Sequence, residues 1–272
     1  MVAELERSNG SGARPAEFCM QDGFAYRFDW GPNGLRTLAP VADVVVIVDV
    51  LRFTTAVSAV IETGGTVFPY RWADANAAAY AAERRAVLAG WREEGGPSLS
   101  PTDLLTLERG TMIVLPSPNG SALAFAAREH GARHVLAGCI RNAWATAAAA
   151  RRLAGPDGAI AIIAAGERWN GATGPLRPAI EDALGAGAIL ATLDPAAAIN
   201  APCCSPEAAA ARAAFVGARP RLYESLAASA SGRELLAWGW QDDVAASAAL
   251  DVAHTAALLV DDAFVPYDPL AP

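Results

Sequence analysis

Short apolar runs alternate with stretches of helical spacing along most of the chain. The runs that predict strands are residues 24–30, 41–48, 66–70, 111–116, 133–138 and 159–166. The intervening stretches predict a short helix from residue 31 and longer helices at 53–62, 73–89, 119–130, 142–153 and 176–192. From residue 205 onward the pattern is helical until the final "AFVPY". Strands that alternate with crossover helices predict an α/β architecture with a mainly parallel sheet and a helical C-terminal region.

The chain is expected to form one folded unit behind an N-terminal tail. Residues 1–20 lack an apolar pattern and predict a flexible tail. Residues 21–272 predict a single α/β domain, because no repeat and no convincing linker divides them. Its C-terminal helical part is expected at about 205–260. The chain is long and apolar enough to bury a large core.

Charge and apolar length exclude several kinds of partner. The formal net charge is −8 and no long basic run occurs, which argues against a nucleic-acid surface and against an anionic membrane surface. The first residues contain no apolar signal segment, and no later segment has the roughly 18 uninterrupted apolar residues of a spanning helix. We therefore expect a cytoplasmic protein without a membrane anchor. All 21 cationic residues are arginines, so no lysine can serve as a nucleophile.

Polar side chains follow four of the predicted strands at the point where each strand ends. These side chains are Asp49, Ser117, Asn119, Arg141, Asn142, Glu167 and Arg168. In an open parallel sheet the carboxyl ends of the strands share one edge, and ligands bind in the crevice outside it. The four clusters are therefore expected to meet in one crevice.

The residues at these strand ends favour an anionic ligand. The side chains placed to cap helix N-termini are Thr54 or Thr55, Asn119 or Ser121, and Asn142. Free backbone N–H groups and the helix dipole favour an anion at such positions. Arg52 and Arg141 add planar guanidinium groups that suit phosphate, sulfonate or carboxylate oxygens.

Four acidic residues conflict with a bare anion. Asp49, Glu167, Glu181 and Asp182 would repel it if they lined the same crevice. A divalent cation such as Mg²⁺ reconciles the two sets, because a hard ion is held by carboxylate oxygens on one side and by phosphate oxygens on the other.

Each feature also fits a simpler structural interpretation. The threonine, asparagine and serine caps fit ordinary helix capping, worth about 1 kcal/mol each. Arg52, three residues after Asp49, fits a local ion pair. Glu181 and Asp182, early in an alanine-rich helix, fit a simple complement to the helix dipole. Ser117 lies in "LPSPN", which lacks the G-x-S-x-G turn of a serine hydrolase.

Six stretches of the chain, taken in order, resemble the 2-phosphosulfolactate phosphatase family. They are "VVVIVDVLRFTTAV", "SPNGS", "CIRNA", "AGERW", "LRPAIEDALGAGAI" and the late "SASGRELLAWGWQDDVAASAALDV" with "FVPY". The resemblance covers about Phe24 to Tyr267. It implies a three-layer α/β/α fold and a Mg²⁺-dependent phosphatase that hydrolyses (R)-2-phospho-3-sulfolactate to 3-sulfolactate and phosphate, a step of coenzyme M biosynthesis.

The resemblance also implies site residues. The D-V-L-R-x-[ST]-[ST] motif, the N-G-[ST] motif, the asparagine after the next strand, the Ala-Gly turn and the Glu-Asp pair fall on Asp49, Arg52, Thr54, Thr55, Asn119, Gly120, Ser121, Asn142, Gly166, Glu181 and Asp182. We assign catalysis to Asp49, Arg52, Glu181 and Asp182. The predicted phosphate- and substrate-binding residues are Thr54, Thr55, Ser117, Asn119, Gly120, Ser121, Arg141, Asn142, Gly166, Glu167 and Arg168.

The resulting hypothesis divides the site into a metal side and a phosphate side. Asp49 with Glu181 or Asp182 holds Mg²⁺, and Arg52 and the turn at 119–121 hold the phosphate. The metal then acts as a Lewis acid and orients the attacking water.

Several alternatives stay open at this point. Arg141 is expected to contact the other anionic groups of the substrate. A rival mechanism makes Asp49 a nucleophile that forms an aspartyl-phosphate; it ranks second, because Leu51 stands where haloacid-dehalogenase chemistry places a second Asp.

The chain could also be a phosphatase for another phosphorylated 2-hydroxy acid, or a phosphometabolite-binding protein without turnover. The alanine-rich faces of the C-terminal helices fit either a homodimer contact or a cover for the sheet.

Overall fold

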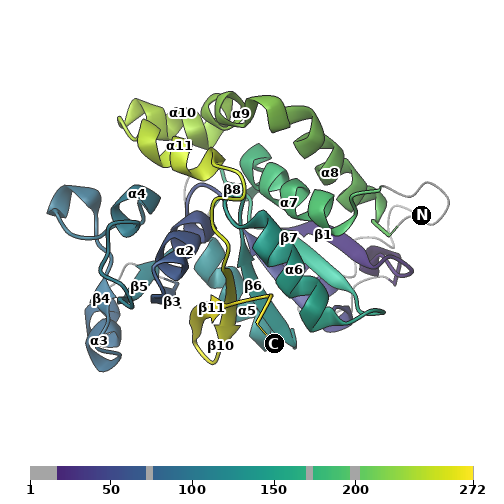
Figure 1. Ribbon diagram of the computed structural model, residues 1–272, viewed down its shortest axis with the longest axis horizontal. Coiled ribbons are helices and arrows are strands. Elements are labelled where there is room, and N and C mark those ends of the chain that lie inside the picture. The colour runs from purple at the N-terminus through teal and green to yellow at the C-terminus, as the bar shows by residue number, and fades with distance from the viewer. Residues whose placement is uncertain (1–16, 72–75, 170–173, 197–202, 272) are drawn as a thin grey trace, which may run out of the picture.

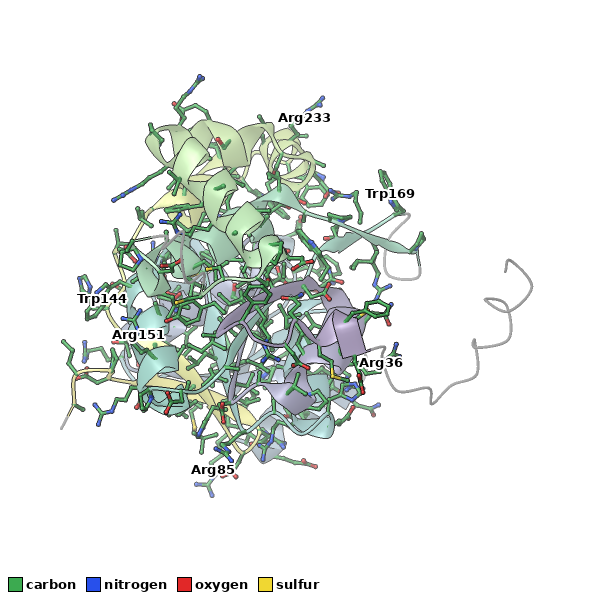
Figure 2. The ribbon with its side chains drawn as sticks, turned by 90° about the vertical axis from the view of Figure 1, so that its right-hand side faces the viewer. Arg36, Arg85, Trp144, Arg151, Trp169 and Arg233 are labelled. Atoms are coloured by element: carbon green, nitrogen blue, oxygen red, sulfur yellow. The ribbon has the colours of Figure 1, made fainter. Side chains whose placement is uncertain are left out.

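The computed structural model describes residues 17–71, 76–169, 174–196 and 203–271. Within them a nine-stranded sheet forms the centre of the molecule (Figure 1). Its strands are β1 (Tyr26–Trp30), β2 (Val44–Val48), β3 (Thr66–Tyr70), β4 (Val87–Leu88), β5 (Met112–Pro116), β6 (His134–Gly138), β7 (Ile160–Ala164), β10 (Ala256–Val260) and β11 (Ala263–Tyr267). A separate hairpin pairs β8 (Glu167–Arg168) with β9 (Leu176–Arg177), and the exposed Trp169 projects from it (Figure 2).

Helices cover both faces of the sheet (Figure 1). They are α1 (Gly31–Leu38), α2 (Phe53–Glu62), α3 (Asn76–Glu83), α4 (Pro101–Leu104), α5 (Gly120–Glu129), α6 (Ala143–Ala154), α7 (Ile180–Leu193), α8 (Pro206–Ala218), α9 (Leu222–Ala228), α10 (Ala230–Ala237) and α11 (Gln241–Ala248). The predicted three-layer α/β/α architecture is confirmed. None of the helices in the described part of the chain combines the length and the apolar character that a membrane crossing requires.

Strand β2 contributes to two separate cores. Its five residues are completely buried. Val44, Val46 and Val48 belong to the core that includes α6, α7 and α8. Val45 and Ile47 belong to the core that includes α1, α2 and α5. Successive side chains of a strand point to opposite faces, so a strand that is covered on both faces needs an unbroken apolar run.

Two parallel groups of strands make up most of the sheet. Neighbours in the order β1-β7-β2-β6 run parallel, and so do neighbours in the order β3-β5-β4. The antiparallel hairpin β10-β11 lies between the two groups and pairs antiparallel with β6 and with β3. The prediction of a mainly parallel sheet is thus confirmed. Three successive antiparallel pairings separate the two groups, so the group β3-β5-β4 runs opposite to the group β1-β7-β2-β6.

The sequence prediction misses this hairpin. It continues the helical region to about residue 260, whereas the last helix ends at Ala248 and Ala256–Val260 is a strand. The run "AALLV" has only five apolar residues, and a run of that length cannot be assigned to a strand or a helix from periodicity alone. Here the partner strands on either side decide the conformation.

Two further boundaries differ from the prediction. The helix expected at 73–89 is described from Asn76 and ends at Glu83, after which Val87–Leu88 forms β4; residues 73–75 lie outside the described part. Arg85 has a φ of 53° there, which no helix accommodates. Of the tail expected at 1–20, residues 17–20 form a 3-10 helix whose last residue, Met20, is buried. Residues 1–16 lie outside the described part.

The C-terminal helices α9 to α11 form a helical cover that packs into the chain's own core (Figure 1). Leu222, Leu226, Leu235 and Val244 all lie in the core that includes α6 and α7. The apolar face of the cover therefore packs within the chain, and a homodimer stays a prediction.

A buried carboxylate, Asp243, ties this cover to the rest of the chain. Asp243 of α11 is completely buried. Its Oδ2 accepts hydrogen bonds from the Nη1 of Arg52 at 2.9 Å and the Nη1 of Arg92 at 3.3 Å. Its Oδ1 accepts from the hydroxyls of Ser100 and Thr102. One side chain thus joins α11, the start of α2 and the segment that leads into α4.

We predict that Asp243→Asn lowers the free energy of unfolding by about 2–4 kcal/mol, measured by urea unfolding. Loss of one partner from a buried ion pair costs about 3–5 kcal/mol. The effect is discounted here because the side chains of Arg52 and Arg92 keep 16% and 30% exposure. The neighbouring exposed Asp242→Asn is the matched control and should change the stability by less than about 0.5 kcal/mol. Equal effects of the two substitutions would contradict the role given to Asp243.

Candidate functional site

A crevice with a volume of about 700 Å³ lies between strand ends of the sheet and helix α10. Six of the predicted site residues line it, namely Asp49, Arg52, Ser117, Asn119, Glu167 and Arg168. The opposite wall consists of residues of α10 and its C-terminal end, including Ser231, Glu234 and Trp238. Segments that follow β2, β5 and β7 therefore meet in one crevice. The segments after β2 and β7 share a carboxyl edge as predicted, whereas β5 runs in the opposite direction, so a common parallel edge does not explain its place there.

Asp49 lies in a tight turn between the end of β2 and the start of α2. The backbone N–H of Asp49 donates to Thr54 Oγ1 at 2.9 Å, and the Thr54 hydroxyl donates back to the Asp49 carbonyl at 2.8 Å. The Thr55 hydroxyl donates to the Val50 carbonyl at 2.7 Å. These bonds hold the turn closed, so the Asp49 carboxylate has a fixed starting position.

The Asp49 carboxylate faces the N-termini of two helices. Its Oδ1 accepts from the N–H of Phe53 in α2 at 3.3 Å, and its Oδ2 accepts from the N–H of Gly120 in α5 at 3.0 Å. Both helices have ten residues, so their dipoles stabilise a negative charge at this point. The close approach requires glycine at position 120, because a Cβ there would lie 2.2 Å from the Phe53 ring and 2.8 Å from Asp49 Oδ2.

Asp182 holds the neighbouring strand ends together from the first turn of α7. Its Oδ1 accepts from the N–H of Val50 at 2.7 Å, and its Oδ2 accepts from the N–H of Gly166 at 2.9 Å. Gly166 has a φ of 66°, a conformation that favours glycine. Asp182 therefore does more than complement its own helix dipole: it fixes the turns after β2 and β7 relative to each other.

Glu181 is the acidic residue of this group with an unsatisfied oxygen. It is 2% exposed, and within the described residues its Oε2 has no hydrogen-bond partner. Buried polar atoms are nearly always paired in native proteins. An unpaired carboxylate oxygen at this position therefore needs a partner from outside the chain: a water, a ligand or a cation.

Glu167 and Asn119 connect the turn after β7 with the start of α5. The Asn119 Nδ2 donates to Glu167 Oε1 at 3.0 Å, and the N–H of Arg168 donates to the same oxygen at 2.8 Å. Arg168 also donates from Nη1 to the carbonyl of Gly174, which closes the β8-β9 hairpin. Asn119 is the N-cap residue of α5, but its side chain makes no capping bond.

Burial and mutual repulsion raise the pKa of two of these carboxylates. Burial, followed by the nearby charge of Glu167, raises the pKa of Asp49 to about 7, although its two N–H bonds act in the opposite direction. Burial also raises the pKa of Asp182 well above its usual range, and the charges of Asp49 and Glu181 add to that effect. The site thus concentrates negative charge that a cation would relieve.

Arg52 has a different partner from the one that sequence spacing suggests. The local ion pair with Asp49 is wrong, since the guanidinium pairs with Asp243, 191 residues away, at 2.9 Å. The same guanidinium lies over the indole of Trp240 at 4.5 Å from the ring centroid. Arg52 still lines the crevice, so it is held in place by α11 and presented to a ligand.

Nine predicted residues are not among those that line the crevice. Thr54, Thr55, Gly120, Gly166, Glu181 and Asp182 belong to the turns and helix starts described above, and the other three make contacts elsewhere. Arg141 donates to Glu62 Oε2 at 2.9 Å, at the far end of α2 and so about one helix length of 15 Å from Asp49. Asn142 Oδ1 accepts from the N–H of Cys139 at 2.9 Å, which closes the turn after β6. Ser121 is completely buried and donates to the Leu115 carbonyl at 3.2 Å.

The predicted helix caps are also wrong. Thr54 and Thr55 lie inside α2, and the N-cap residue of that helix is Arg52. Asn142 occupies the N-cap position of α6 without a side-chain capping bond. Their polar atoms satisfy the backbone of the preceding turns instead.

Sequence reasoning missed the residues that the helical cover and the β4–α4 segment bring to the site. Asp243 and Trp240 support Arg52, and Trp91 and Trp238 line the crevice. The stretch "WGWQDDV" is the sequence feature that indicates a buried role for these residues, because two tryptophans close to an acidic pair are unusual on a solvated helix. Its partner, however, cannot be read from local spacing.

The carboxylates suit Mg²⁺ chemically, although they do not form a closed metal cage. No three His, Cys, Asp or Glu side chains of the described residues are grouped as a complete metal site. Mg²⁺ usually takes only one or two protein carboxylates and completes its shell with waters and substrate phosphate. Asp49 and Glu181 fit this pattern, because Glu181 Oε2 is unpaired and the Asp49 pKa is raised by burial and by its acidic neighbours. Asp49 and Asp182 each accept one backbone N–H bond at both carboxylate oxygens, and of these two residues only Asp49 lines the crevice.

We predict that the metal-free protein loses stability as the pH rises from 3.8, the ordinary Asp value, to about 7. The folded state holds a proton on Asp49 that the unfolded chain releases, so ionisation favours unfolding. The charges that face Asp49 are those of Glu167, Glu181 and Asp182. Urea unfolding of the wild type and of Asp49→Asn, measured in EDTA across this pH range, tests the prediction. The stability of the wild type minus that of the variant should fall with pH, and a constant difference would contradict it.

Comparison with known proteins agrees with this arrangement. The family model for 2-phosphosulpholactate phosphatase matches residues 33–262. A probable 2-phosphosulfolactate phosphatase of Thermus thermophilus is 37% identical over 133 residues, which are 46% of this chain and 54% of that protein. The chain therefore spans about half the length of this curated relative. The family match runs from α1 to the turn between β10 and β11 and contains every residue of the crevice described above, so the chain belongs to the 2-phosphosulpholactate phosphatase family.

Proposed function

We propose that the protein is a Mg²⁺-dependent phosphatase for a small anionic phosphomonoester. The substrate class is the phosphorylated 2-hydroxy acids, and the first candidate is (R)-2-phospho-3-sulfolactate, which would yield 3-sulfolactate and phosphate. The family of the chain and the name of its Thermus relative support this proposal. The observation that carries it is the acidic group of the buried Asp49, Glu181 and Asp182 with the half-buried Glu167, of which Asp49 and Glu167 line the crevice and Asp49 faces two helix N-termini.

The acidic residues favour a hydrolase over a protein that only binds anions. A receptor for an anion has no use for a carboxylate whose pKa is raised by burial and by neighbouring acidic charge. Asp49 and Glu181 would hold Mg²⁺, and the charge of Glu167 lies close to Asp49. When bound, the ion would supply Lewis-acid stabilisation of the phosphoryl oxygens and a position for the attacking water.

The phosphate side of the crevice is formed by the start of α5 and by two arginines. The N-terminus of α5 follows the turn at Asn119, and N–H groups at such a position favour phosphate oxygens. Arg52 and Arg168 line the same space. Arg52 is braced on one face by Trp240 and at Nη1 by Asp243, so its remaining donors keep a fixed direction, as charge stabilisation in phosphoryl transfer requires.

Ser117 completes the floor of the crevice. It is 3% exposed, and its N–H donates to the Tyr70 carbonyl at 2.9 Å. Its position after β5 therefore follows from pairing with β3. In this scheme a water attacks the phosphorus and the bond from phosphorus to the substrate oxygen breaks. The released oxygen takes a proton from water. Ser117 is therefore not needed as a nucleophile.

We predict that Asp49→Asn lowers kcat/KM for phosphate release by about 10²- to 10⁴-fold, without loss of the folded state. Replacement of a buried, repelled carboxylate by an isosteric amide removes the proposed metal ligand and also relieves charge repulsion. Phosphate release from phosphorylated 2-hydroxy acids and urea unfolding of the same preparations measure the two effects.

The exposed Asp261→Asn, in the turn between β10 and β11, is the matched control and should keep both activity and stability. If Asp49→Asn retained full turnover, the proposed role of Asp49 would be refuted. If the wild type released no phosphate from any of the compounds at any Mg²⁺ concentration, the phosphometabolite-binding alternative would replace the proposed function.

We also predict that activity disappears with EDTA and returns with Mg²⁺, and that Glu181→Gln raises the Mg²⁺ concentration for half-maximal activity by about 10- to 100-fold. The unpaired Oε2 of Glu181 is the reason for this expectation. Glu224→Gln is the matched control, because Glu224 also lies in the first turn of a helix but is exposed. Identical Mg²⁺ titrations of the wild type and Glu181→Gln would exclude Glu181 as a ligand.

A further inference from the structure

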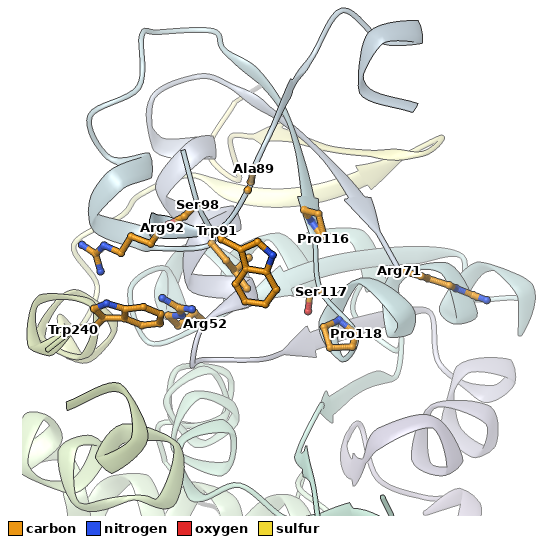
Figure 3. A pocket seen from close by; sticks show the side chains of 12 residues that line it. Arg52, Arg71, Ala89, Trp91, Arg92, Ser98, Pro116, Ser117, Pro118 and Trp240 are labelled. Atoms are coloured by element: carbon orange, nitrogen blue, oxygen red, sulfur yellow. The ribbon is translucent and has the colours of Figure 1, made fainter. Parts of the chain in front are cut away.

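A second cavity, which we call the side chamber, adjoins the crevice. Its volume is about 440 Å³. It shares five lining residues with the crevice, namely Arg52, Trp91, Leu99, Ser117 and Pro118. Ala89, Pro116 and Trp240 complete its apolar wall (Figure 3). The phosphate site proposed above therefore has an adjoining space on the side of Arg52.

The three arginines of the side chamber are already matched by carboxylates. Arg52 pairs with Asp243 at 2.9 Å. Arg92 pairs with Asp243 at 3.3 Å and with Asp103 at 3.4 Å. Arg71, at the other side in Figure 3, pairs with Glu129 at 3.3 Å. Three guanidinium groups thus face three carboxylates, so the described residues that line the side chamber carry no excess positive charge, although the Arg71 Nε is buried without a hydrogen-bond partner.

The surfaces that remain open to a ligand are flat and apolar. Arg52 and Arg92 both lie over the indole of Trp240, at 4.5 and 5.7 Å from the ring centroid. In Figure 3 the Trp91 ring lies between these arginines and the prolines at 116 and 118. Indole, guanidinium and proline surfaces favour a planar, weakly polar group. A cavity of about 150 Å³ is enough for a benzene ring, so the side chamber is larger than a phenyl group needs.

We propose that the side chamber binds an aromatic substituent of the substrate, so that the preferred compounds are phosphorylated 2-hydroxy acids with a phenyl-sized group on C3. This inference rests on the proposed function and narrows its substrate class. The phosphate lies in the crevice between the acidic group and Arg52, and the ring lies beyond Arg52 against Trp91 and Trp240. Arg52 separates the two halves of the ligand and contacts both.

The test compares 2-phospho-3-phenyllactate with 2-phospholactate, which lacks only the ring. The wild type is expected to show a kcat/KM about 10- to 100-fold higher for the phenyl compound, the range for burial of one aromatic ring. Calorimetric binding of the same two compounds gives a second readout that needs no turnover. 2-Phospho-3-sulfolactate, whose charged sulfonate would enter a mainly apolar chamber without excess positive charge, should lack this advantage over 2-phospholactate.

The variant Ala89→Leu tests whether the preference for the phenyl compound arises in the side chamber. Ala89→Leu places a larger side chain in the wall of the side chamber, and the ratio of kcat/KM between the phenyl compound and 2-phospholactate should fall at least about tenfold. The ratio does not depend on the fraction of active protein. Ala209→Leu, at an exposed position of α8, is the matched control and should keep the wild-type ratio.

The outcomes separate this inference from the proposed function. Hydrolysis of 2-phospholactate or 2-phospho-3-sulfolactate without preference for the phenyl compound would overturn the inference and leave the phosphatase assignment standing. No hydrolysis of any compound, together with tighter binding of the phenyl compound, would support the side chamber as a binding site and overturn the assignment. Equal binding of 2-phospho-3-phenyllactate and 2-phospholactate would overturn the inference in either case.

Discussion

The burial of Asp49 among other carboxylates is the constraint on which the rest of the site depends. A buried charge is strongly unfavourable unless it is paired and hydrogen-bonded. The chain supplies backbone N–H groups from four separate places: Phe53 and Gly120 for Asp49, and Val50 and Gly166 for Asp182. These donors lie at the ends of β2 and β7 and at the starts of α2 and α5. The strand ends must therefore align to within hydrogen-bond distance before the acidic group can be buried.

This requirement explains why glycine and threonine stand at positions without contact to a ligand. Gly120 has no Cβ because Asp49 and the Phe53 ring occupy that space. Thr54 and Thr55 use their hydroxyls on the carbonyls and N–H of the turn that carries Asp49. Their contribution to function is the position of the carboxylate, and a role as direct phosphate ligands is not needed to explain them.

Local physics predicts most of the elements and the edge at which the site lies. The run Val44–Val48 is apolar without a break because it is covered on both faces, and that pattern correctly identifies a central strand. Polar residues after β2, β5 and β7 line the crevice, whereas Arg141 and Asn142 after β6 do not. The same local reasoning fails where a distant partner decides: Arg52 chooses Asp243 over Asp49, and the five apolar residues Ala256–Val260 become a strand between β6 and β11.

The two cavities differ in how charge is matched, and this difference assigns them different tasks. Asp49 lines the crevice with a raised pKa, and its acidic neighbour Glu181 is buried with an unpaired oxygen, so the proposed cation and phosphate are assigned to this space. In the side chamber, each of the three lining arginines has a carboxylate partner, and the exposed surfaces are flat.

Arg52 lines both cavities, and Asp243 fixes it from the helical cover. Because Asp243 has no exposed surface and accepts four hydrogen bonds, a shift of the cover would move Arg52 and the boundary between the two cavities together. The position of α11 therefore helps to set where Arg52 lies between the two cavities.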